Sequence, residues 1–156
     1  MPPREVGRMM TIKELLIKHE GKKSRPYKCP AGFNTIGVGY NFDANPLPED
    51  IEAYLKKNGK ITDYMIDRLF DLSLHVALSG CRALFPVFDT FSHNRQIALI
   101  DLVFQLGKAG MTKFKKSIPL INAGKWEEAA KEMRKSEWAK QTKNRSIEIT
   151  NMIREG

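Results

Sequence analysis

The chain has 156 residues, 42% of them hydrophobic and 28% charged, a composition typical of a soluble globular protein that can bury one core. No run approaches the ~18 apolar residues of a membrane-spanning helix, and Met9-Met10 open no apolar leader, so we expect neither a membrane span nor a secretory signal peptide. The net charge of +8 favours an anionic partner such as nucleic acid, anionic lipid or peptidoglycan.

A helix is predicted after a loose lead-in of residues 1–10. Thr11 and Glu14 have the spacing of a capping box, and apolar residues then recur at helical spacing up to Gly21, a natural stop. The segment 27–40 reads as a turn followed by a strand at 35–38. A loop with one short amphipathic segment follows between residues 45 and 59.

The remainder of the chain has helical periodicity. Helices are predicted at 62–79, closed by Gly80, from Ser92 to Gly107, and at 113–123, 126–135 and 144–154. These elements predict one domain of residues 1–156 with an α+β, mainly α, fold. It would comprise the lead-in, a small mixed N-terminal lobe with a β-hairpin or sheet (11–60), a connecting helix (61–80) and a helical C-terminal lobe (81–156).

Cys29 and Cys81 are the only cysteines, which fits free thiols in a reducing compartment. There is no Cys-x-x-Cys pair and no cluster of histidines, so we predict no metal site and no cofactor.

Glu20 stands at the carboxyl end of the first predicted helix. The partial negative charge of that helix end, and burial beside Leu16 and Ile17, both disfavour a carboxylate. We therefore expect Glu20 to stay protonated near neutral pH, as a general acid must. The alternative is a solvated glutamate.

Cys29 lies in a turn next to Lys28, which we expect to lower the pKa of its thiol. The alternative is a small buried apolar residue. Thr35 by itself needs no function. A cysteine–histidine nucleophile pair that uses one of the three histidines has no supporting local motif.

Taken together, these residues form an ordered pattern: Glu20, eight residues, Cys29, five residues, Thr35, and then Ile36-Gly37-Val38-Gly39. Two further blocks follow at 98–107 and 125–145. With these blocks, the chain resembles the phage-type lysozymes over residues 11–156. The resemblance implies a lysozyme-like fold.

The resemblance also implies a muramidase that hydrolyses the β-1,4 bond between N-acetylmuramic acid and N-acetylglucosamine in peptidoglycan. Glu20 would be the general acid, and Cys29, in place of the family's usual aspartate, would assist water attack together with Thr35. The positions that match the family's sugar contacts are Phe104, Ser117, Asn41 and Glu132, although the family has leucine at the third and asparagine at the fourth.

The implied partner is the glycan strand of peptidoglycan. We expect the protein to act as a monomer and to have no nucleic-acid partner. The absent signal peptide fits an endolysin that collects in the host cytoplasm and reaches the periplasm by a holin-type route. Two alternatives stay open: a catalytically silent lysozyme-like module that binds the wall, with Cys29 as the mark of lost activity, and a basic nucleic-acid-binding protein.

Overall fold

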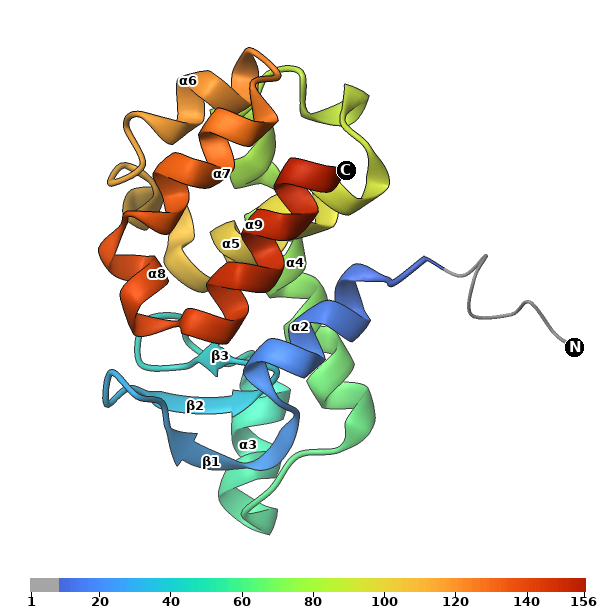
Figure 1. The fold of residues 1–156 in the computed structure, drawn as a ribbon. Helices are drawn as coiled ribbons and strands as arrows, with labels where there is room; N and C mark the ends of the chain where they lie inside the picture. The colour runs from blue at the N-terminus through green and yellow to red at the C-terminus, as the bar shows by residue number, and fades with distance from the viewer. Residues whose placement is uncertain (1–8) are drawn as a thin grey trace, which may run out of the picture. The chain divides into compact units, whose positions relative to one another are not determined.

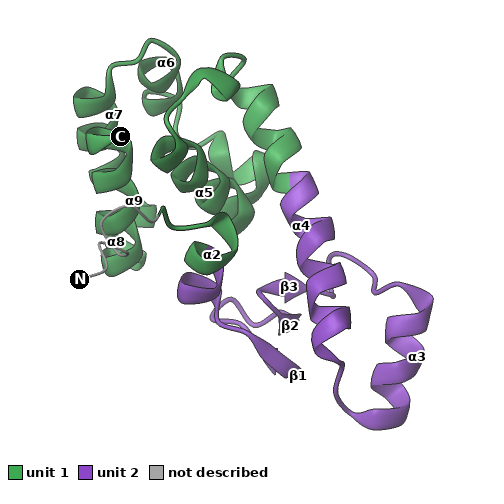
Figure 2. Ribbon diagram, turned by 90° about the vertical axis from the view of Figure 1, so that its right-hand side faces the viewer, with its two compact units in different colours: residues 1–15, 77–156 green, residues 16–76 purple. Residues whose placement is uncertain are grey.

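The computed structural model describes residues 9–156 (Figure 1); residues 1–8 of the predicted lead-in lie outside the described part. The described chain divides into two compact units, residues 16–76 and residues 9–15 with 77–156 (Figure 2). The boundaries fall inside two helices, α2 (Ile12–Glu20) and α4 (Asp63–Leu84).

The predicted capping box starts α2. The Thr11 N–H donates to Glu14 Oε1 at 3.0 Å, and the Glu14 N–H donates to Thr11 Oγ1 at 3.1 Å. Two N–H groups at the helix start are thereby satisfied reciprocally. This fixes the first turn of the helix that carries Glu20 at its other end.

The smaller unit holds a three-stranded antiparallel sheet in the order β1 (Lys23–Lys28), β2 (Asn34–Gly37) and β3 (Tyr40–Asn41). A hairpin or sheet was expected here, and β2 lies where its strand was predicted, but the positions of β1 and β3 were not predicted. Pro26 lies within β1, and a proline is tolerated there because β1 is an edge strand with an irregular register between Lys23 and Tyr27.

Apolar residues from β2 and the two helices of this unit form its core. Ile36 of β2, Ile51 of α3 (Glu49–Asn58) and Leu69 of α4 are fully buried. An ion pair between Asp50 and Arg68 joins α3 to α4. The sheet is therefore backed by packed side chains, which gives its turns a rigid support.

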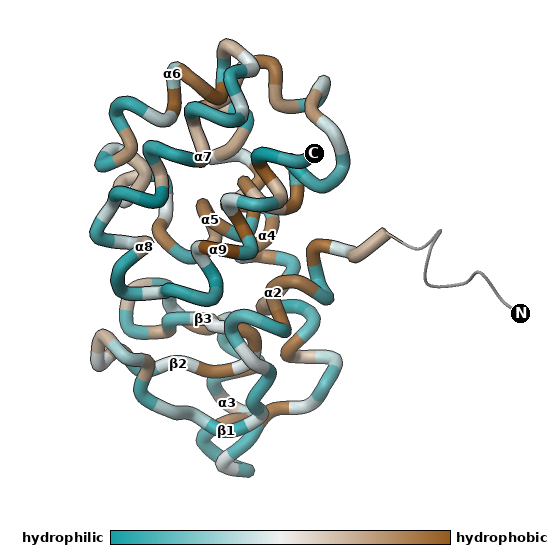
Figure 3. Tube along the Cα trace, viewed as in Figure 1, coloured by the Kyte–Doolittle hydropathy of each residue, from teal (hydrophilic) through white to brown (hydrophobic). Residues whose placement is uncertain are grey.

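The larger unit is helical and is built around α5 (His93–Met111), whose central residues 97–103 are all buried. Ser92 caps α5 as predicted, its hydroxyl accepting the Arg95 N–H at 3.3 Å. Around it lie the 3₁₀ turn η1 (Phe88–Thr90) and the helices α6 (Ser117–Asn122), α7 (Trp126–Arg134), α8 (Glu137–Gln141) and α9 (Lys143–Glu155). Figure 3 shows hydrophobic residues on α5 and mostly hydrophilic ones around α8.

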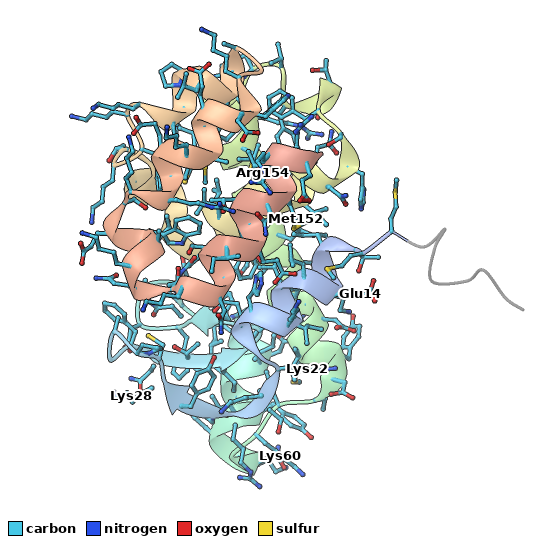
Figure 4. All side chains as sticks on the ribbon, viewed as in Figure 1. Glu14, Lys22, Lys28, Lys60, Met152 and Arg154 are labelled. Atoms are coloured by element: carbon cyan, nitrogen blue, oxygen red, sulfur yellow. The ribbon has the colours of Figure 1, made fainter. Side chains whose placement is uncertain are left out.

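Two polar contacts hold α9 to α5. Buried Asp101 accepts from Arg145 Nε at 3.0 Å, an ion pair shielded from water. Arg95 donates to the carbonyl oxygens of Ile153 at 2.7 Å and of Arg154 at 3.1 Å. It thereby caps the C-terminal end of α9, where Arg154 lies (Figure 4).

Two predicted helices have different bounds in the structure, and one helix was missed. Helix α4 continues past Gly80 to Leu84, because Gly80 serves close packing: a Cβ there would lie 3.0 Å from Val103. The helix predicted at 113–123 begins only at Ser117, because Pro119 is tolerated in a first helical turn and not in an interior. Helix α8 was not predicted. The remaining helices, and the mainly α, α+β class, are confirmed. Within residues 9–156, every helix is too short or too polar to cross a membrane.

Candidate active site

Glu20 is the last residue of α2, which ends as Gly21 donates its N–H to the Ile17 carbonyl at 2.8 Å. The Glu20 side chain is half-buried and packs against the backbone of Gly39. A Cβ added at Gly39 would lie 2.8 Å from Glu20 Oε1, and Gly39 has a positive φ of 63° that favours glycine. The acid and the end of the Ile-Gly-x-Gly segment are thus in contact.

Cys29 lies in the tight turn that joins β1 to β2. Its N–H donates to the Phe33 carbonyl at 3.0 Å, and its carbonyl accepts the Gly32 N–H at 2.8 Å. These two bonds close a three-residue loop, for which Pro30 supplies a suitable backbone angle. The thiol is free and half-exposed, so it is accessible to a substrate or a reagent.

The turn surrounds the Cys29 sulfur with hydrogen-bond donors. Desolvation by burial acts to raise the pKa of this thiol, but hydrogen bonds from the backbone of Phe33, Ala31 and Gly32 and from the Thr35 side chain together lower the pKa below its ordinary value. Backbone N–H groups that converge in this way stabilise an anion. We call this set of donors the thiolate cradle.

Lys28, which the sequence suggested as the cause of a lowered pKa, is not among the groups that act on Cys29. It lies at the hairpin end of β1 (Figure 4) and instead acts on Asp43, where its charge helps to lower the carboxyl pKa after hydrogen bonds from Asn34. Neighbouring residues of an extended chain point to opposite faces, which explains why sequence adjacency misled here. The direction of the predicted shift was right and its cause was wrong.

Thr35 is 3% exposed and pairs directly with Tyr27 across the β1–β2 ladder. Its hydroxyl donates to the Phe33 carbonyl at 2.9 Å and also hydrogen-bonds the Cys29 sulfur. Because a hydroxyl carries one hydrogen, it can donate to only one of these two acceptors at a time. The Thr35 hydroxyl can therefore donate to the Cys29 thiolate and turn to the Phe33 carbonyl when Cys29 is protonated.

Tyr27 belongs to the same group, although the sequence analysis did not single it out. Burial raises the pKa of Tyr27 first, and the charges of Glu20 and Cys29 raise it further. The phenol therefore lies near both the acid and the thiol, and it stays protonated at neutral pH. The signal was present in the strand period of two, which puts Tyr27 and Cys29 on one face, but it required β1 to be recognised.

Asn41, the one predicted sugar contact in the smaller unit, is partly engaged in a turn. Its Oδ1 accepts the backbone N–H groups of Asp43 at 3.0 Å and Ala44 at 3.1 Å. This leaves the amide nitrogen as the group of Asn41 that is available to a ligand.

The other three predicted sugar contacts belong to the larger unit. Phe104 is half-buried in α5, and Glu132 of α7 pairs with Lys135 at 3.5 Å. Ser117 begins α6 and is only 3% exposed. Their role in substrate binding stays a prediction.

The arrangement in the smaller unit combines three chemical abilities. Glu20 can deliver a proton, the thiolate cradle can hold a base of lowered pKa, and Thr35 can supply or withdraw a hydrogen bond. These three abilities together support general acid–base chemistry. Across residues 9–156, no three His, Cys, Asp or Glu side chains gather as a metal site.

Comparison with known proteins identifies relatives along nearly the whole chain. Residues 17–152 match the family described as phage lysozyme. The chain is 35% identical to "Probable T4-type lysozyme 1" and 32% identical to "Probable T4-type lysozyme 2" of Dictyostelium discoideum, each alignment covering 94% of this chain and 95% of the relative. It is also 30% identical to a segment that makes up 28% of the "Pre-baseplate central spike protein Gp5" of Enterobacteria phage T4.

Proposed function

Because the chain belongs to the phage lysozyme family, we propose that it is a lysozyme that hydrolyses the β-1,4 bond between N-acetylmuramic acid and N-acetylglucosamine in peptidoglycan. The observation that carries the proposal is the contact between Glu20 and Gly39. It joins the first and last parts of the recognised pattern in space, and it gives the acid a fixed position, which a proton donor requires.

In the proposed reaction, Glu20 gives its proton to the glycosidic oxygen as the bond from that oxygen to the anomeric carbon breaks. Water attacks the same carbon, and the proton that it loses passes to the Cys29 thiolate. The sugar ring gains one hydroxyl and the leaving sugar another, so the atoms balance as a hydrolysis. Exchange with solvent then returns Glu20 to the acid form and Cys29 to the thiolate.

The thiolate cradle supports the role of Cys29, since a lowered pKa raises the fraction of thiolate at neutral pH. When Cys29 takes the proton, the Thr35 hydroxyl is released to bond the Phe33 carbonyl, an acceptor already within reach. The Thr35 hydroxyl therefore has an acceptor in both protonation states of the base.

The test compares the wild type with Glu20→Gln on purified peptidoglycan. Gln keeps the shape of Glu and lacks the transferable proton, so we expect muramidase products by mass analysis from the wild type and almost none from the variant. Equal product from both would remove Glu20 from the reaction. Binding without cleavage by either would identify a silent wall-binding module, and glucosaminidase or amidase products would identify another enzyme.

We further propose that the protein acts as a monomeric endolysin, made in the host cytoplasm and released to the wall by a holin-type pore. Expression in a bacterium with and without such a pore tests this setting. Rapid lysis is expected only when the pore is present. Lysis of similar speed without it would show that another route reaches the wall.

A further inference from the structure

The end of α5 and the loop that follows it carry a concentration of positive charge. Residues 102–116 contain no acidic residue. Within residues 9–156, the lysines of this stretch are exposed and form no ion pair. We call them the lysine segment; they are Lys108, Lys113, Lys115 and Lys116.

The backbone of the lysine segment is held in place. Helix α5 is interrupted at Gly107, with φ 72° and ψ 164°, so the chain turns there. Met111 and Phe114 are then buried, and the Phe114 ring meets Trp138 edge-on with 5.8 Å between centroids. The lysines alternate with these anchors and therefore extend into solvent from a fixed support.

The lysine segment also dominates the charge of its unit. Residues 77–156 contain 14 basic and 8 acidic side chains, a net charge of +6, whereas residues 16–76 contain 9 and 8, a net charge of +1. Four unpaired lysines without a nearby acid in the sequence thus account for most of the excess. A field of this kind attracts a partner that carries several negative charges.

We propose that the lysine segment binds the carboxylates of the peptide side chains of peptidoglycan. This inference rests on the proposed function for its substrate class. The segment lies along the chain between Phe104 and Ser117, two positions expected to contact sugar. A glycan strand held near these positions would carry peptide carboxylates on alternate sugars, within reach of long lysine side chains.

Lysine suits carboxylates that are mobile better than arginine does. The segment contains no arginine, whose planar fork suits bidentate recognition of a fixed phosphate or carboxylate. An ammonium group is a hydrated point charge that tolerates many geometries. Flexible peptides on a polymer present their acids in many geometries, so the binding would be additive, dependent on salt and tolerant of peptide sequence.

The experiment measures sedimentation with purified sacculi in the Glu20→Gln background, so that binding is observed without hydrolysis. The test variant changes Lys108, Lys113, Lys115 and Lys116 to Gln. The matched control removes the same charge from the same unit by changing other exposed lysines to Gln, all of them close in sequence to acids: Lys125, Lys131, Lys140 and Lys143. Thermal melts verify that both variants fold.

We expect about tenfold weaker binding for the test variant and less than about threefold for the control, as four modest exposed contacts would give. Converting the wall carboxylates to neutral amides should remove the difference between the two variants. Equal loss in both, or a difference that survives amidation, would overturn the proposal. So would a difference lost only when wall phosphates are stripped, or DNA binding as strong as sacculus binding.

Failure of the proposed function is distinguishable from failure of this inference. Product analysis of the wild type tests the cleavage, whereas sedimentation of Glu20→Gln tests the lysines without any turnover. Intact cleavage with equal binding by both lysine variants would reject the lysine segment alone.

Discussion

Replacing Gly39 by Ala tests whether the position of Glu20 matters for catalysis. The new Cβ would lie 2.8 Å from Glu20 Oε1, 3.0 Å from Cδ and 3.2 Å from Cγ. Ordinary contacts begin near 3.4 Å, so the carboxylate must move by roughly 0.6 Å. A shift of that order in a reacting group lowers kcat by about 10- to 100-fold. The positive φ adds a stability loss of about 1–2 kcal/mol, or roughly 2–8 °C in Tm for a chain of this size.

Gly37→Ala is the matched control, since Gly37 lies in the same segment with a φ of 67°. Its added Cβ would meet only the Ile66 side chain, at an ordinary 3.5 Å. Both variants should lose similar stability, and only Gly39→Ala should lose most of its activity per folded molecule. Rates are measured on purified peptidoglycan at a temperature where both variants are folded. Equal specific activities would refute the reasoning that the Gly39 contact positions the acid.

Three further outcomes follow from the hydrogen bonds and burial. In Thr35→Val, the pKa of Cys29 should rise, so alkylation by iodoacetamide should need a higher pH and activity should fall about tenfold; an unchanged alkylation midpoint would contradict this. In the native wild type, iodoacetamide should modify Cys29 and abolish activity while sparing buried Cys81. Because burial raises the pKa of Cys81 to about 12, the unfolded thiol ionises first, and the free energy of unfolding should fall by up to about 1.4 kcal/mol per pH unit between pH 9 and 12. Cys81→Ala should remove that slope. Arg95→Met should lower stability by about 2 kcal/mol, and Arg95→Lys should not restore it, because one ammonium cannot replace the guanidinium fork at two carbonyls; a melt like that of the wild type would show the cap to be dispensable.

Local signals in the sequence were sufficient for several elements. The Thr11–Glu14 capping box and the Ser92 cap both form, because each is completed by residues three positions away. Strand β1 could not be predicted in the same way. Its residues around Pro26 have weak strand propensity, and they become a strand by pairing with β2 in the hairpin.

The candidate site shows the same division between local and tertiary information. Glu20, Cys29 and Thr35 were proposed because their pattern resembles that of a known family. The cause of the Cys29 pKa shift could not be predicted, since it depends on where backbone N–H groups point in a folded turn. Tyr27 was missed because its nearness to Glu20 depends on how α2 meets the sheet. Spacing identifies the residue types, and folding decides which of them lie together.

The thiolate cradle has a consequence for substitution of Cys29. Its donors recognise a negative charge, and they are supplied largely by the main chain at Ala31, Gly32 and Phe33, which mutation of side chains leaves in place. The same donors would also stabilise a carboxylate at position 29. An aspartate in place of Cys29 would therefore keep a base in the same set of donors without any change to the hairpin backbone.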